Sequence, residues 1–232
     1  MKGEEAPKPE ALRALVEQAK GALKVFPLPG VVVLPGTPTP LHVFEPRYRA
    51  LTADALAGDR VMAVATLVRD EDAPQTRAAV HPVAGAAFIE SHERLADGRY
   101  HIVLRGADRV RLLGELERGK PYREFEAEVL QDLYPPGGPS ALGERMEALK
   151  RCVYQLTRLL PAESGASELA EAAARLRVPS RLADLVAAAV VSEPEARLQI
   201  LAELDVGKRL DEVMADVASV ILMLSQGKSP NA

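Results

Sequence analysis

Residues 26–51, FPLPGVVVLPGTPTPLHVFEPRYRAL, constrain the fold more than any other part of this chain. Two prolines near the start hold the backbone extended, because proline fixes its own φ and pushes the preceding residue out of the helical region. The apolar run 31–34 predicts a short buried strand, and Pro35-Gly36 predicts the turn that ends it. Pro46 suits the first turn of a helix. The segment therefore predicts a strand, a turn and a helix start in close succession.

Further strands follow this segment. Residues 61–68 form a near-continuous apolar run, and residues 80–89 form another that we expect Gly85 to break. In residues 100–105 the side chains of Tyr100, Ile102 and Leu104 share one face of a predicted strand, and Asp97-Gly98 just before them predicts a hairpin turn. Strand follows strand with little helix between, and closing such strands on themselves removes exposed edges. The pattern predicts a small, mostly antiparallel barrel.

The spacing of apolar residues changes after the segment YPPGGP at 134–139. Beyond it apolar side chains recur at helical intervals, which predicts a bundle of helices. We therefore divide the chain into five predicted parts: a helical extension at 1–21, a barrel at 22–134, a linker at 135–139, a helical bundle at 140–226 and a tail at 227–232.

Two stretches of the chain combine into a recognisable pattern. The first contains FPL at 26–28, the apolar run ending in Pro-Gly, PL at 40–41 and FEPRY at 44–48; the second is DGRYHIVLRGADRVRL at 97–112. Both resemble signatures of the amino-terminal, substrate-binding domain of Lon proteases. The resemblance implies an α+β fold, with a small, mostly antiparallel PUA-like β-barrel followed by an α-helical bundle. It also implies a structural role for the motif residues Glu45, Pro46, Arg47, Asp97, Gly98 and Gly106.

The sequence offers no complete catalytic motif. GELERGK at 114–120 has the glycine spacing of a phosphate-binding loop, but Pro121 stands where a Mg²⁺-binding Ser or Thr is required. No Gly-x-Ser-x-Gly elbow is present, and the four histidines lack metal-ligand spacing. Lon proteases add an ATPase module and a Ser-Lys proteolytic module, for which 232 residues leave no room. We therefore expect a protein that is not an enzyme, with no cofactor and no metal.

Charge and hydropathy limit the possible partners and location. The net charge is −4, with acidic and basic residues evenly mixed, and the basic run expected of a nucleic-acid-binding chain is missing. No apolar stretch approaches the ~20 residues needed to cross a bilayer, and the polar start MKGEEAPKPE is unlike a secretory signal. The sequence therefore predicts a cytoplasmic protein without a membrane partner, and it disfavours a nucleic-acid partner.

A resemblance to a substrate-binding domain directs attention to apolar and basic side chains that could contact a polypeptide. The candidates are Leu28, Leu41, Val43, Phe44, Tyr48, Arg109 and Arg111. Two interpretations remain open for them. The apolar members either line a binding groove or fill the barrel core, and the arginines either contact a ligand or pair with nearby carboxylates.

The resulting hypothesis is a non-catalytic, Lon-like recognition module that binds exposed apolar segments of unfolded or damaged polypeptides. It would act as an adaptor in protein quality control, with a protease or a chaperone as a further partner. The alternative is an RNA-binding module, because barrels of the PUA-like type bind RNA in other proteins. That alternative rests on analogy of fold alone.

Overall fold

The computed structural model describes residues 7–68 and 78–226. The chain divides into two compact units, one ending at Leu130 and the other beginning at Gln131, and each is described by itself. This division falls a few residues before the predicted linker at 135–139. The predicted tail, 227–232, and the first six residues of the predicted extension lie outside the described residues.

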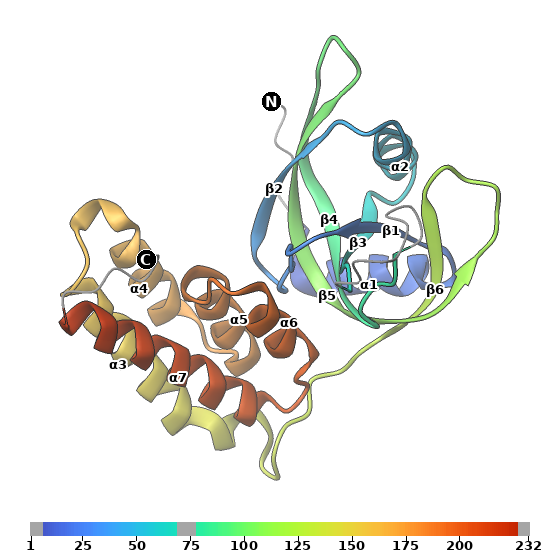
Figure 1. Ribbon diagram of the computed structural model, residues 1–232. Helices are drawn as coiled ribbons and strands as arrows, with labels where there is room; N and C mark the ends of the chain where they lie inside the picture. The colour runs from blue at the N-terminus through green and yellow to red at the C-terminus, as the bar shows by residue number, and fades with distance from the viewer. Residues whose placement is uncertain (1–6, 69–77, 227–232) are drawn as a thin grey trace. The chain divides into compact units, whose positions relative to one another are not determined.

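The first unit is built on six strands, five of which close into a barrel while β2 pairs at its edge with β5 (Figure 1). In space their order is β2-β5-β4-β3-β1-β6, and a further pairing of β5 with β6 completes the ring. Only the pairing of β1 with β3 is parallel among the strands of the sheet. The predicted α+β class and the mostly antiparallel barrel are confirmed. The strands are β1 (Leu23–Leu28), β2 (Pro38–Val43), β3 (Val61–Thr66), β4 (Val83–Arg94), β5 (Tyr100–Leu116) and β6 (Arg123–Val129).

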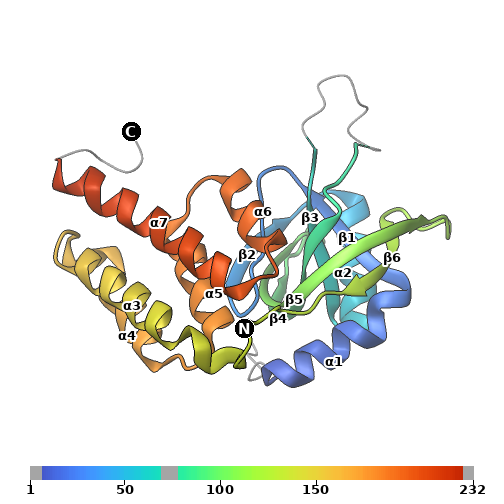
Figure 2. The ribbon, with the colours of Figure 1, turned by 90° about the horizontal axis from the view of Figure 1, so that it is seen from below.

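Two helices cover this barrel on different sides (Figures 1 and 2). Helix α1 (Pro9–Ala19) buries Val16 in a cluster to which all five strands of the closed ring contribute. Helix α2 (Pro46–Ala57) starts with Pro46 in its first turn, as predicted, and buries Tyr48 and Leu51 in a second cluster. Because strand side chains alternate between the two faces, neighbouring residues of one strand enter different clusters.

In the run 31–34 the last three residues are buried, but the run forms no strand, so that prediction is wrong. The chain here crosses the face of the sheet and does not pair beside a strand. Two of its carbonyl oxygens lie directly against glycines of the sheet. A Cβ atom on Gly85 would lie 2.0 Å from the Val33 carbonyl oxygen, and one on Gly106 would lie 2.1 Å from the Leu34 oxygen. Gly85 therefore does not break β4, which runs through it; it makes room for a crossing chain.

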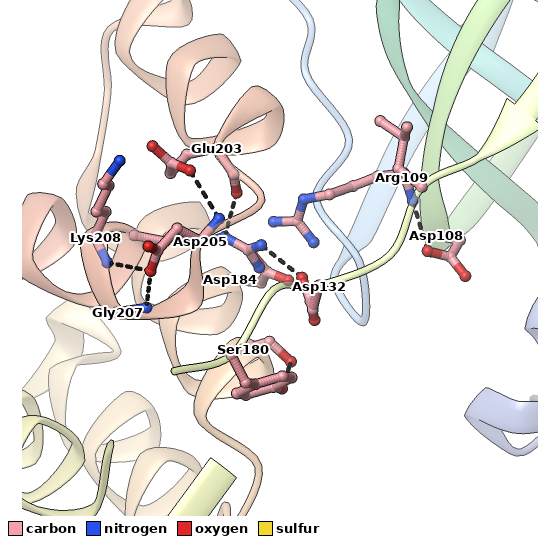
Figure 3. A network of polar contacts seen from close by, with 12 residues as sticks. Asp108, Arg109, Asp132, Ser180, Asp184, Glu203, Asp205, Gly207 and Lys208 are labelled. Carbon is pink, nitrogen blue, oxygen red and sulfur yellow. Dashed lines mark hydrogen bonds and ion pairs between the residues drawn. The ribbon is translucent and has the colours of Figure 1, made fainter. Parts of the chain in front are cut away.

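The second unit is helical, as the spacing of its apolar residues predicts. The helices that start at Pro179 and Pro194 each have that proline in the first turn. The side chain of Asp205 caps the last helix by accepting from the N–H groups of Gly207 and Lys208 (Figure 3). Two short 3₁₀ turns, Gly138–Leu142 and Ala162–Ser164, accompany the helices. The helices are α3 (Gly143–Thr157), α4 (Ala166–Arg175), α5 (Pro179–Val190), α6 (Pro194–Ala202) and α7 (Val206–Ser225).

Candidate functional site

The two signature stretches of the sequence meet in the barrel unit. Gly98, in the hairpin turn between β4 and β5, has φ +81°, and a Cβ atom there would lie 2.2 Å from Nη2 of Arg49 on α2. The turn is held by Asp97, which accepts from the N–H of Arg99 at 3.0 Å. At the start of α2, Arg47 and Glu45 form an ion pair of 2.9 Å. These motif residues therefore hold the turn and the first residues of the helix in place.

The structure does not gather the predicted polypeptide-binding residues on one surface. Val43, Tyr48 and Arg109 are buried, and the first two belong to the core cluster beneath α2. Leu28 and Leu41 are half-buried beside that cluster. The core interpretation therefore fits Val43 and Tyr48.

Phe44 and Arg111 are the exposed members of the predicted set. The side chain of Phe44 is 61 % exposed, although it directly follows the buried end of β2. Arg111 is paired with Glu128 at 3.3 Å on the neighbouring strand β6. Phe44 thus presents an unusually large apolar surface to solvent for an aromatic residue.

A pocket of about 270 Å³ lies next to Phe44 along the chain, on strands β2, β5 and β4. Strand register places six of its lining residues in two rows, on the face opposite to the buried Tyr100 and Leu104. We call this site the strand pocket. One row is Pro40, Val103 and Ser91, and the other is His42, His101 and Glu93. A third row, Leu41, Ile102 and His92, also lines the pocket.

Ring contacts connect the strand pocket to Phe44. The ring centroids of His42 and Phe44 lie 5.9 Å apart, and those of His42 and His101 lie 4.8 Å apart. His101 Nδ1 lies 3.9 Å from a carboxylate oxygen of Glu93. The apolar surface of the pocket is therefore continuous, through the His42 ring, with the exposed Phe44. Sequence reasoning missed the contribution of β4, because only strand register places Ser91 and Glu93 beside β5.

The strand pocket adjoins an edge of the sheet. Strand β2 pairs with β5 alone among the described strands. The N–H of Gly106 donates to the Thr37 oxygen at 3.0 Å, so alternation directs the main-chain groups of Pro38, Pro40 and His42 away from β5. Proline has no N–H, which leaves His42 as the main-chain donor on the outer edge of this strand. The edge can therefore pair with about one residue of an extended segment and resists longer pairing.

A second pocket, of about 310 Å³, lies between the end of β1 and the start of α2. Its walls include Leu28, Tyr48 and Tyr122 together with two arginines that already have carboxylate partners, Glu45 for Arg47 and Glu115 for Arg123. The predicted residues Leu28 and Tyr48 therefore belong to a different pocket from Leu41. Its charges are compensated within the protein.

Behind this second pocket Asp54 joins α2 to the residues just before β6. The Tyr122 hydroxyl donates to Asp54 at 2.6 Å, and Lys120 Nζ lies 2.8 Å from the same oxygen. The hydrogen bond from Lys120 is the main cause that lowers the pKa of Asp54 below its usual value. Burial, followed by the bond to Asp54, raises the pKa of the Tyr122 hydroxyl. A tyrosine held protonated in this way fixes the helix and is not poised as a base.

Within 7–68 and 78–226, no three His, Cys, Asp or Glu side chains are grouped so that they could hold a metal ion. In the same ranges no helix has the length and hydropathy to cross a membrane.

The fold and the strand pocket define a class: an α+β protein in which a closed barrel with an apolar surface site precedes a helical unit. The family model described as ATP-dependent protease La (LON) substrate-binding domain matches residues 22–215, and the chain belongs to this family. Lon protease 2 of Myxococcus xanthus is 30 % identical over 200 residues, which is 85 % of this chain and 24 % of that protein. The chain thus spans about a quarter of the length of such curated relatives.

Two solved structures share the fold. One is the crystal structure of a Lon N-terminal domain protein from Xanthomonas campestris, with a TM-score of 0.57 and 22 % identity over 84 % of this chain and 97 % of that one. The other is the N-terminal domain of the Mycobacterium avium complex Lon protease, with a TM-score of 0.62 and 21 % identity, covering 85 % of this chain and 98 % of that one. At this identity the likeness shows the fold alone.

Proposed function

We propose that this protein is a non-catalytic recognition module that binds exposed apolar segments of unfolded or damaged polypeptides at the strand pocket. The observation that carries the proposal is the apolar pocket beside the exposed Phe44, next to a strand edge with one available main-chain donor. Membership of a substrate-binding family supports it. In this role the protein serves as an adaptor in protein quality control, and a protease or chaperone would receive the bound polypeptide.

The geometry of the strand pocket suggests how a client binds. An extended segment would place one apolar side chain against Pro40 and Val103 and a second against the ring of Phe44. The N–H of His42 would donate to the client backbone. The pocket lies just below the ~300 to 1,000 Å³ of typical small-molecule sites, so it holds only one or two side chains. We therefore expect weak binding with low sequence specificity, which suits a protein that recognises unfolded polypeptides.

The RNA-binding alternative gains no support from these observations. Two basic side chains of β5 are already paired, Arg105 with Glu90 at 2.9 Å and Arg111 with Glu128. Glu93 also places negative charge on the rim, which disfavours a phosphate backbone.

The proposal is tested by titrating a fluorescently labelled, permanently unfolded polypeptide with the protein and measuring anisotropy. Phe44→Asp should weaken binding about tenfold, because about 1.4 kcal/mol of apolar contact is lost. The matched control is Leu113→Asp, since Leu113 is also an exposed apolar side chain, 56 % accessible, but lies outside the pocket. That variant should bind like the parent protein.

Two results would overturn the assignment. Equal binding by the parent and a folded Phe44→Asp variant would remove Phe44 from the site. Equal weakening by both variants would show that any exposed apolar residue contributes, and that the strand pocket has no special role. Binding to single-stranded RNA that falls steeply with salt would favour the alternative function instead.

A further inference from the structure

A third pocket of the barrel unit lies between helix α2 and the hairpin that joins β4 to β5 (Figure 1). Its volume is about 310 Å³. Its charged lining side chains are Arg49 on α2 and Arg94 at the end of β4, and no acidic side chain of the described residues joins them there. We call this site the arginine pocket. Its apolar walls are Pro46, Ala50, Ala53 and Tyr100.

The hairpin turn holds Arg49 in this pocket. A Cβ atom on Gly98 would lie 2.2 Å from Nη2 of Arg49, so the guanidinium lies directly against the glycine. The acidic side chain of the same turn, Asp97, accepts from Nε of Arg99 at 2.7 Å. The bond from the Arg99 N–H is the main cause that lowers the pKa of Asp97, and the charge of Arg49 is the smallest of its causes. Packing therefore places Arg49 without using its N–H donors.

An aromatic ring places Arg94. Its guanidinium carbon lies 5.9 Å from the ring centroid of Tyr100, its cross-strand partner in the register of β4 and β5. A cation is attracted to the face of an aromatic ring without donating a hydrogen bond. Neither Arg49 nor Arg94 forms a hydrogen bond or an ion pair with the part of the chain that the structure describes. Both guanidinium groups therefore keep their donors for another partner.

The second pocket of the barrel unit shows the opposite arrangement. Its arginines Arg47 and Arg123 pair with Glu45 and Glu115 at 2.9 and 2.7 Å. In the arginine pocket two guanidinium groups without such a partner border an apolar space. This combination fits a group that is anionic and is attached to apolar atoms. The carboxylate of a polypeptide has this chemistry, whereas a free phosphate would leave the apolar walls unused.

We propose that the arginine pocket binds a carboxylate of the polypeptide held at the strand pocket, from its C-terminus or from an acidic side chain. This inference rests on the proposed function and adds a second feature of the client. Phe44 connects the two pockets, because its ring lies beside His42 of the strand pocket and it precedes Pro46 by two residues, at most about 7 Å of extended chain. A client side chain on Phe44 is therefore followed, within one or two residues, by the arginines.

The inference is tested with three labelled peptides of one unfolded sequence, compared by fluorescence anisotropy. The first peptide ends in a free carboxylate, the second in an amide, and the third in a glutamate whose main-chain end is an amide. The free acid should bind the parent protein about tenfold more tightly than the plain amide, because charge-assisted hydrogen bonds form with two guanidinium groups. This gain should shrink as salt is added. A gain limited to the glutamate peptide would assign the pocket to acidic side chains.

Arg49→Gln and Arg94→Gln should each remove most of the gain, and if one of these variants does not fold, the other decides. Arg118→Gln is the control, because Arg118 is exposed in the loop between β5 and β6 and lies outside the arginine pocket. It loses the same charge and should keep the gain. A gain that falls equally in all folded variants would overturn the inference, since net charge alone would then explain it.

Two further results separate this inference from the proposed function. Equal binding of all three peptides by the parent protein would overturn the arginine pocket as a carboxylate site, while the proposed function would stand. Binding of none of the peptides would overturn the proposed function, and the inference with it.

Discussion

Two apolar runs of the same signature segment, 31–34 and 40–44, end in opposite environments. In the first run, Val33 and Leu34 are almost fully buried. In the second, Phe44 is 61 % exposed and His42 lies open to solvent, although Val43 between them is buried. Both runs are apolar by composition, yet one forms core and the other forms the rim of a pocket.

The difference comes from what lies beneath each run. Two glycines let the main chain of 31–34 approach the sheet directly, with carbonyl oxygens where Cβ atoms would otherwise stand. Run 40–44 pairs as an edge strand, so its side chains alternate between the core and the outer face. Burial of an apolar segment is therefore decided by the neighbours that its backbone meets, and composition alone does not indicate it.

The largest expected effect is at Gly106. Gly106→Ala should destabilise the protein by about 3 kcal/mol, at the upper end of overpacking effects, because the new Cβ meets the Leu34 backbone, which cannot move aside as a side chain could. The measurement is urea unfolding followed by far-ultraviolet circular dichroism.

Gly114→Ala on the same strand is the control, since a Cβ there meets nothing within 4 Å. We expect it to change the free energy of unfolding by less than about 0.5 kcal/mol. Equal stability of the two variants would mean that the buried run does not rest on Gly106, and the contrast between the two runs would lose its explanation.

A smaller loss is expected at the turn that receives α2. Gly98→Ala should cost about 1 to 2 kcal/mol, because alanine is strained at φ +81° and its Cβ would displace the Arg49 guanidinium. Removing that guanidinium with Arg49→Ala relieves the contact but leaves the backbone strain. In a double-mutant cycle the two substitutions should therefore be less than additive. Strict additivity would show that Arg49 does not pack on this turn.

The sequence predicted the elements of this molecule better than their contacts. The prolines and the 3.6-residue spacing correctly indicated α2 and the later helices, because local chemistry decides where a helix starts. Run 31–34 was expected to be a strand because apolar composition does not reveal whether a chain pairs beside a sheet or crosses it. The strand pocket depends on register between strands far apart in sequence, which no single segment encodes.

A still smaller effect should appear at alkaline pH. The pKa of Tyr122 is raised in the folded protein by burial and by its bond to Asp54. The protonated Tyr122 hydroxyl therefore stabilises the folded state fully below the unfolded pKa of about 10. This stabilisation is lost as pH rises into the alkaline range. Tyr122→Phe should cost about 1 kcal/mol at neutral pH and flatten the fall of stability above about pH 10. Urea midpoints at neutral and alkaline pH would measure both, and an unchanged alkaline slope would separate Tyr122 from the docking of α2.

The smallest expected change in stability is at Phe44, and this prediction sharpens the comparison most. Phe44→Ser should alter the free energy of unfolding by no more than about 0.5 kcal/mol, because an exposed side chain loses little burial when it is truncated. Thermal or urea unfolding of the variant measures this directly. A loss of several kcal/mol would mean that Phe44 supports the barrel as Val33 does. A near-zero effect leaves a large aromatic surface whose exposure the fold does not require, as the proposed binding role of Phe44 expects.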